Sequence, residues 1–248
     1  MIKYNFQRQE YKYLLNSDQY SQVRDYLIKR GLTPDTYSQK HPQKSYYVAS
    51  LYLDTSDYQA YWEKQYGIHS RVKYRLRTYS QAGKKNTPIF WEIKRKFGDF
   101  QKKDRFQLSW ENTSSMINSI ASLDQLSMGT SHQKLLIKYY LDWLKKNLQP
   151  SILISYTREP FIDLFYPNFR LTFDYQIQAA ATNNLFSKFK QAQVLPNQII
   201  MEIKFTGLIP SYISHLNQYF NFSRQSLSKY CLALEACDIV AEENNTIN

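Results

Sequence analysis

Cations alternate with apolar residues along the heptapeptide RVKYRLR, residues 71–77. In a β-strand, successive side chains point to opposite faces, so the cations would share one face and the apolar residues the other. The four cations are Arg71, Lys73, Arg75 and Arg77. Neighbours on that face would lie roughly 7 Å apart, twice the strand rise, and would repel one another. A polyanion lying along the strand would supply the missing counter-charge.

The same alternation recurs in four further segments, which are residues 8–13, 90–96, 170–174 and 201–205. Three of them contain the tripeptide pattern Glu-x-Lys. A single such strand is typical of a solvated outer face. Its repetition opposite mostly large, apolar residues favours a shared anion-binding function instead.

The chain has 248 residues, 32 Lys and Arg against 21 acids, and a net charge of +11. This balance favours an anionic partner, which could be nucleic acid, a phosphate compound or a membrane surface. We do not expect nucleic acid as the partner, because Tyr74 and Trp91 fall on the face opposite most of the cations instead of beside them. A Gly-Lys-Ser/Thr loop and a Cys/His cluster with zinc spacing are both absent, which argues against a P-loop enzyme and a zinc site.

Neither end of the chain predicts a membrane anchor. Residues 1–6 lack the apolar region of a signal peptide, and no apolar run approaches the length of a bilayer span. We therefore expect a cytoplasmic protein without membrane insertion. Since no Pro- or Gly-rich linker divides the sequence, we expect a single domain over 1–248, with its core at about 6–236.

Hydrophobic periodicity predicts an α+β fold with helices packed on an antiparallel sheet. The expected strands are 6–15, 46–54, 68–79, 88–97, 103–110, 151–158, 168–177 and 198–206. The expected helices are 17–30, 57–65, 113–126, 131–147, 210–220 and 226–236, with residues 33–45 as a polar loop. The charged strand faces could meet water in an open sheet, or line the interior of a closed barrel with helices outside.

Seven motifs in order resemble the VTC domain, the polyphosphate polymerase branch of the triphosphate tunnel metalloenzymes (the CYTH-like superfamily). They are YVASLYLDT (47–55), RLRTY (75–79), WEIKRK (91–96), YTREPF (156–161), RLTFD (170–174), MEIKF (201–205) and SLSKY (226–230). The resemblance implies an eight-stranded antiparallel tunnel barrel with a basic interior and helices outside. It also implies transfer of the γ-phosphate of ATP onto inorganic polyphosphate.

The resemblance further implies roles for individual residues. The cations expected to act in catalysis are Lys12, Arg75, Arg77, Lys94, Arg158, Arg170 and Lys204. The residues expected to bind phosphate besides these are Arg8, Arg71, Lys73, Lys96, Arg105, Ser228 and Lys229. The metal, Mn²⁺ or Mg²⁺, is expected on Glu202, with Glu10 as a second ligand.

One departure from the superfamily pattern reduces the expected number of metal ligands. Arg8 stands where the wider superfamily has the first acid of Glu-x-Glu-x-Lys. Two alternative functions stay open, a triphosphate or polyphosphate hydrolase and a non-catalytic polyphosphate-binding module. The expected ligands are ATP and inorganic polyphosphate or triphosphate. A membrane-protein partner and the oligomeric state also stay open.

Overall fold

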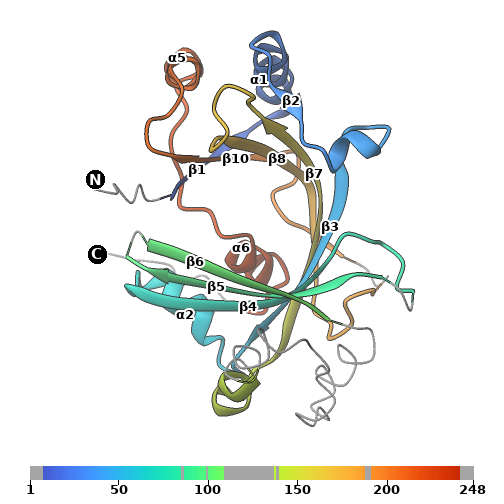
Figure 1. Ribbon diagram of the computed structural model, residues 1–248. Helices are drawn as coiled ribbons and strands as arrows, with labels where there is room; N and C mark the ends of the chain where they lie inside the picture. The colour runs from blue at the N-terminus through green and yellow to red at the C-terminus, as the bar shows by residue number, and fades with distance from the viewer. Residues whose placement is uncertain are drawn as a thin grey trace. The chain divides into compact units, whose positions relative to one another are not determined.

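The computed structural model describes residues 8–84, 87–98, 100–108, 137, 140–187 and 191–240 (Figure 1). The chain divides into two compact units. Unit 1 comprises Met1–Tyr47, Ser155–Gln178 and Gln193–Ser228, and unit 2 comprises Val48–Ile154, Ala179–Ala192 and Lys229–Asn248. Each unit contains antiparallel strands with helices on them, as expected for an α+β protein.

In unit 1, four strands lie in the order β1 (Arg8–Leu15), β10 (Ile199–Thr206), β8 (Arg170–Ala180) and β7 (Gln149–Ile162). The short strand β2 (Thr33–Pro34) pairs with the end of β7, and β9 (Ala192–Gln193) pairs with β8. Strands β7 and β8 both continue into unit 2. The strands β2 and β9 were not expected from the sequence, because two-residue strands carry too little periodicity to detect.

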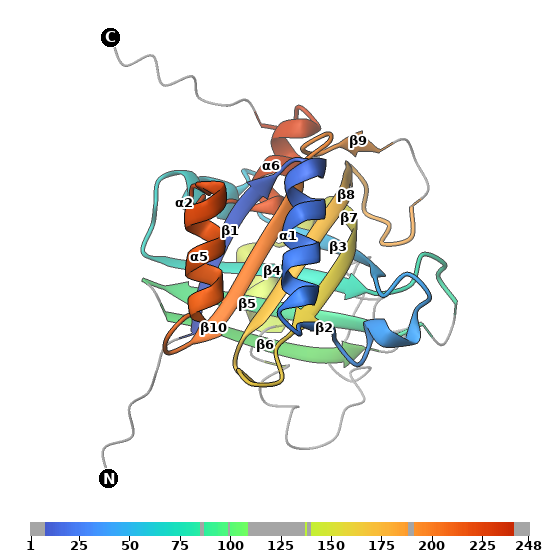
Figure 2. The same ribbon diagram turned by 90° about the horizontal axis from the view of Figure 1, so that it is seen from above.

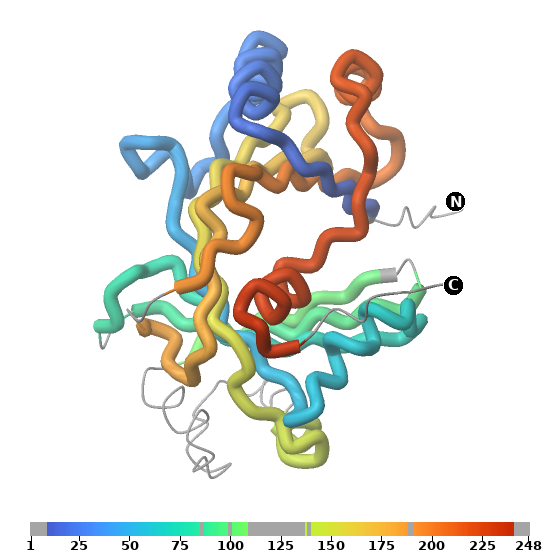
Figure 3. Tube along the Cα trace, turned by 180° about the vertical axis from the view of Figure 1, so that it is seen from behind, coloured from blue at the N-terminus to red at the C-terminus, as the bar shows by residue number. Residues whose placement is uncertain are grey.

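Two helices of unit 1, α1 (Ser17–Lys29) and α5 (Ser211–Phe220), cover one face of these strands (Figure 2). Helix α1 begins in a capping box, in which the Asn16 side chain accepts from the Gln19 N–H and the Gln19 side chain accepts from the Asn16 N–H. After α5, the chain returns beside β1, where the Gln225 N–H donates to the Lys12 carbonyl (Figure 3).

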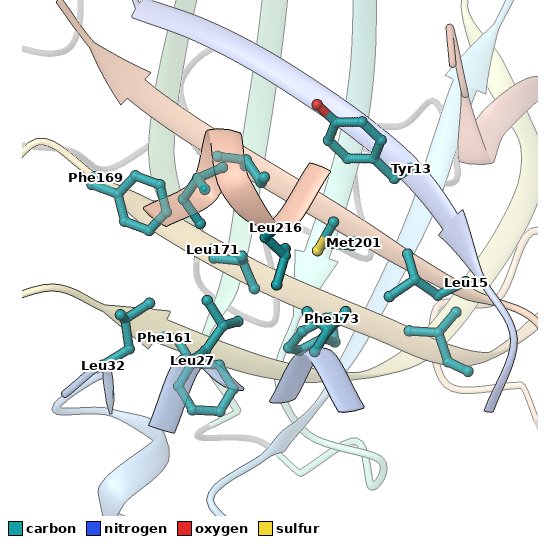
Figure 4. Packing of buried hydrophobic residues seen from close by; sticks show 14 of the residues in the cluster. Tyr13, Leu15, Leu27, Leu32, Phe161, Phe169, Leu171, Phe173, Met201 and Leu216 are labelled. Atoms are coloured by element: carbon teal, nitrogen blue, oxygen red, sulfur yellow. The ribbon is translucent and has the colours of Figure 1, made fainter. Parts of the chain in front are cut away.

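The apolar core of unit 1 lies between these helices and the strands (Figure 4). Leu27 and Leu216 of the helices pack against Leu171, Phe173 and Met201 of the strands, and all five are buried. Because strand side chains alternate, burying this face leaves the residues between them on the opposite face of the strands. That opposite face carries the charged residues of unit 1.

In unit 2, four strands follow one another in a meander of β3 (Tyr46–Asp54), β4 (Ser70–Thr78), β5 (Ile89–Phe97) and β6 (Phe100–Leu108). The first two residues of β3 belong to unit 1. Helices α2 (Gln59–Gln65) and α6 (Lys229–Ala236) complete this unit, together with a helical stretch at 140–146. Tyr74 and Trp91 are buried, and Trp91 packs edge-on against Trp143 with ring centroids 5.8 Å apart.

The antiparallel α+β class is confirmed, but the closed barrel is not. The strand order runs from β1 at one end to β6 at the other, and among the described residues these two end strands do not pair. The single domain over 1–248 stays a prediction. The expected helix 113–126 and about half of 131–147 lie outside the described residues, and the described residues 140–146 are helical as expected. The expected loop 33–45 contains, besides β2, a short 3₁₀ helix, η1 (Ser38–Lys40).

Candidate anion-binding faces

The strand register of unit 2 brings its cations into cross-strand rows. Lys73 on β4 lies opposite Lys94 on β5, and Lys94 lies opposite Lys103 on β6. Residues directly opposite in an antiparallel pair share a face, and like charges in these positions destabilise the sheet. The neighbouring rows are Arg71–Lys96–Gln101 and Arg75–Glu92–Arg105. We define this face of β4, β5 and β6 as the basic face of unit 2.

A single buried carboxylate, Glu92, lies at the centre of the basic face of unit 2. Arg75 donates through Nε to Glu92 Oε2 at 2.8 Å, and Lys103 Nζ lies 2.6 Å from Oε1. Arg77 and Arg105 each lie 3.6 Å from this carboxylate. Burial alone would raise the pKa of Glu92, but Arg75, Arg77 and Lys103 hold it well below its usual range. One carboxylate therefore contacts four basic side chains, and the three arginines outnumber it even though burial lowers the pKa of Lys103 to about 7.

The hydroxyl of Tyr52 lies among the cations of this face. Its oxygen accepts a hydrogen bond of 2.9 Å from Arg75 Nη1, and Tyr52 is buried. Although burial alone would raise the pKa of Tyr52, the attraction of its phenolate to Arg75, Arg77 and Lys73 lowers it to about 8. A phenol that ionises this readily indicates a surface arranged to stabilise anionic oxygen.

Helix α6 covers part of the same face. Lys73 Nζ lies 4.7 Å from the ring centroid of Tyr230 and 3.7 Å from Cys231 Sγ. Tyr230 stacks on Tyr52 with ring centroids 5.0 Å apart, and its hydroxyl donates to the buried Asp54. Burial lowers the pKa of Lys73. Lys73 is therefore held against α6, whose first residue is Lys229.

In unit 1, the cations and acids of β1 and β10 alternate across the strand pair. Lys12 lies opposite Glu202, and Glu10 lies opposite Lys204. Lys204 forms an ion pair with Glu202 and lies 3.9 Å from Glu10 Oε2, while Lys12 Nζ lies 3.0 Å from Glu10 Oε1. Burial lowers the pKa of Lys204, although both carboxylates oppose this effect. We define this face of the unit 1 strands as the mixed face.

Arg158 belongs to this mixed face and is held by a buried carboxylate. Its Nε and Nη2 donate to the two oxygens of Asp174 at 2.6 and 2.7 Å, and Asp174 is fully buried. Burial opposes the charge of Arg158, but Asp174 raises its pKa well above the usual value. Arg170, opposite Lys204 in register, donates to Asp35 at 2.7 Å. Both arginines are therefore oriented by acids before any ligand binds.

Two further expected residues of unit 1, Ser228 and Arg8, are placed by a neighbouring backbone contact and by strand register. Lys12 Nζ donates to the Leu227 carbonyl at 2.8 Å, which places the following residue, Ser228, beside β1. Arg8 takes the register position opposite Thr206, at the end of β10. The structure therefore brings together Lys12, Lys204, Arg158 and Arg170 in unit 1, whereas Arg71, Lys73, Arg75, Arg77, Lys94, Lys96 and Arg105 share a face in unit 2.

Two residues that contact the basic face, Lys103 through Glu92 and Tyr52 through Arg75, were not among the expected site residues. Lys103 could have been found, because it alternates with Gln101 and Arg105 in the same way as the cations of β4. Tyr52 carries no such signal, since only the pairing of β3 with β4 brings it opposite Arg75.

The two acids expected to bind metal, Glu10 and Glu202, lie on neighbouring strands and both contact Lys204. Among the residues that the structure describes, no three His, Cys, Asp or Glu side chains form a group that could enclose a metal ion. Mg²⁺ in phosphate-transfer sites commonly uses one or two carboxylates and takes its other ligands from phosphate and water. The two acids fit a metal of that kind, shared with a phosphate ligand.

Solved structures with a similar fold come from distant proteins. A crystal structure of a candidate adenylate cyclase from Bacillus halodurans is 14% identical, with a TM-score of 0.51, over 90% of this chain and 94% of its own. A protein from Pyrococcus horikoshii is 11% identical, with a TM-score of 0.46, over 94% of this chain and 99% of its own. No curated protein matches the sequence. At 14% identity, the likeness to the Bacillus halodurans structure shows the fold alone.

A family model extends over most of the described residues of both units. The model of the VTC domain matches residues 7–237, nearly the whole chain. This range includes all strands and helices that carry the basic and mixed faces. The chain therefore belongs to the VTC domain family.

Proposed function

We propose that this protein is a metal-dependent polyphosphate polymerase that transfers the γ-phosphate of ATP onto a growing chain of inorganic polyphosphate. The observation that carries the proposal is the row Lys73–Lys94–Lys103 beside a single buried Glu92. Such a row costs stability in an empty sheet and becomes favourable when a chain of phosphates lies along it. Membership of the VTC family supports the same function.

The residues present suit the chemistry of phosphoryl transfer. That reaction depends on positioning the phosphates and neutralising their charge far more than on covalent help from the protein. Arginine can bind two phosphate oxygens at once, and Arg75 and Arg158 are already oriented by Glu92 and Asp174. The nucleophile would be the terminal phosphate of the acceptor, which is anionic without help. No protein base is required for the transfer.

A divalent metal would be held by Glu202 and Glu10 of the mixed face. When bound, Mn²⁺ or Mg²⁺ would neutralise phosphate charge as a Lewis acid. The protein would supply these two carboxylates and would hold Lys12 and Lys204 beside them. The two carboxylates would then hold the metal, and the two lysines would hold the phosphate oxygens.

The proposal predicts that the purified protein, incubated with ATP and Mn²⁺, makes long polyphosphate that can be separated on a polyacrylamide gel. Arg75→Ala should lower the rate by roughly 10²–10³-fold, because it removes a preorganised charge from the transferred group. Lys102→Ala is the matched control. It lies on β6 opposite Arg95, on the other face of the strands, and should keep the normal rate.

The products of this experiment also distinguish the alternatives. Free orthophosphate without long chains would replace the polymerase by a hydrolase. Tight binding of triphosphate without ATP consumption would identify a binding module.

Glu202→Gln should abolish both the activity and its metal dependence. A normal rate in this variant would show that the metal is held elsewhere.

The same proposal predicts that inorganic triphosphate binds more weakly as the pH rises through about 8. Tyr52, whose pKa is lowered to about 8, gains a negative charge beside Arg75, and Lys103, whose pKa is lowered to about 7 mainly by burial, loses its remaining positive charge. Both changes remove attraction for the anion. Isothermal titration at several pH values measures the effect, and Tyr52→Phe should remove part of it. An affinity that stays constant across this range would contradict the assignment.

A further inference from the structure

Large apolar side chains project from one end of unit 1, far more exposed than is usual for residues of their kind. Phe165 is 89% exposed, Leu208 is 92% exposed and Leu164 is 72% exposed. The first and third belong to the β7–β8 hairpin, and Leu208 belongs to the connection from β10 to α5. Both connections leave the strands at the same end (Figure 2). We call Leu164, Phe165, Tyr166 and Leu208 the apolar tip.

The two connections meet at a shallow hollow of about 120 Å³, lined by Phe165, Tyr166 and Leu208 among others. The side chain of Asp163 holds the turn of the hairpin in place. Asp163, which is buried, accepts from the backbone N–H groups of Phe165 and Tyr166 at 2.8 and 3.2 Å, and from the Tyr212 hydroxyl. The exposed side chains are therefore presented by a hydrogen-bonded turn, whose conformation does not depend on their own burial.

Two exposed arginines are linked to the apolar tip or its hollow through chains of aromatic contacts. On the α1 side, Arg30 lies over the ring of Tyr26 at 5.2 Å, and the Tyr26 hydroxyl donates to the carbonyl of Tyr212. Tyr212 in turn contacts Tyr166 of the tip, with ring centroids 6.4 Å apart.

On the β1 side, Arg224 lies over the ring of Tyr11 at 4.2 Å, and Tyr11 packs edge-on against Phe205, which lines the hollow. Both arginines are exposed. Asp163, the carboxylate among these contacts, is buried, so the exposed charges of the two contact chains are those of Arg30 and Arg224.

We propose that this end of unit 1 docks on an anionic membrane surface, with the apolar tip in the headgroup region and Arg30 and Arg224 beside lipid phosphates. Peripheral binding combines buried apolar side chains with attraction of cations to anionic lipid, and neither alone anchors a protein stably. A tyrosine at the edge of an aliphatic and aromatic group suits this boundary, since its ring is apolar and its hydroxyl polar.

A protein partner fits the tip less well than a membrane does. A stable protein interface buries about 800 Å² on each side around an apolar core, which is more than four side chains on two narrow connections provide. Lipid headgroups impose no matching shape on the tip. None of the described helices is long and apolar enough to cross a bilayer, so the contact would rest on the surface.

Flotation of the full chain with vesicles tests the proposal. The protein should float with vesicles of equimolar phosphatidylcholine and phosphatidylglycerol, and at least tenfold less with phosphatidylcholine alone. The double variant Phe165→Ser with Leu208→Ser should lose most of the binding, and Arg30→Gln with Arg224→Gln should lose its dependence on phosphatidylglycerol. Tyr219→Ser is the matched control, because Tyr219 is also 80% exposed but lies at the far end of α5.

A second readout locates the tip itself. In the Phe165→Trp variant, lipids with brominated acyl chains should quench the tryptophan fluorescence more than they do in the unmodified protein. The proposal is overturned if the unmodified protein binds neither vesicle, if Tyr219→Ser lowers binding as much as the tip variant, or if Phe165→Trp is not quenched. The unmodified protein could also self-associate without binding vesicles, and the tip variant could abolish this self-association. That result would mean that the tip binds a second copy of the protein, and it would overturn the membrane proposal as well. Polyphosphate synthesis by the tip variant in solution should be unchanged.

Discussion

Arg158→Ala should lower the free energy of unfolding by about 3–5 kcal/mol as well as stop phosphate transfer. Asp174 is fully buried, and both of its oxygens accept from Arg158 at 2.6 and 2.7 Å. Removing the guanidinium leaves an ionised carboxylate without its partner in the interior, and this costs far more than the loss of an exposed ion pair. The sequence alone suggests only a role in catalysis for Arg158, and the buried pair adds a role in stability.

A double variant separates the structural role of Arg158 from its role in binding phosphate. Arg158→Met with Asp174→Leu replaces the pair by apolar side chains, which is often neutral for stability. We expect this variant to regain most of the free energy of unfolding, measured by urea denaturation, and to remain inactive. If Arg158→Ala alone unfolds at the same urea concentration as the unmodified protein, the ion pair is not a stabilising element of unit 1.

The charged faces could be predicted from the sequence because they depend only on a local rule. Side chains alternate along a strand, so the order of residues in β4 and β5 already places Arg75 and Lys94 on the faces where the structure has them. The bounds of β3 agree with the expectation because of another local feature, which is that residues 46–54 are nearly continuously apolar.

What could not be predicted depends on contacts between distant residues. Arg170 donates to Asp35, which is 135 positions away in the sequence and lies in a segment without periodicity. Tyr52 comes opposite Arg75 only through the pairing of β3 with β4. Closure of a barrel is less predictable still, because it depends on strand tilt and stagger, to which every strand contributes. This is the part of the expected fold that the described strands do not confirm.

Glu92→Gln should have opposite effects on stability and on anion binding. Without the charge of Glu92, the four cations that contact it lose this counter-charge and repel one another more strongly, and we expect the free energy of unfolding to fall by about 3–5 kcal/mol in the absence of anions. The same excess of positive charge should strengthen triphosphate binding. Since a ligand stabilises the folded state by mass action, triphosphate should raise the melting temperature more in this variant than in the unmodified protein.

The pH dependence of unfolding gives the sharpest measurement of this role. The pKa of Glu92 is lowered in the folded state, so its contribution to stability is present above its unfolded pKa of about 4.3 and is lost as the pH falls through the folded value. Glu92→Gln should lack this acid-sensitive component in urea denaturation. Asp104→Asn is the matched control, because Asp104 pairs with Arg95 on the other face of the same strands. It should leave triphosphate affinity unchanged. Equal triphosphate affinities in Glu92→Gln and the unmodified protein would mean that phosphate does not bind among these cations.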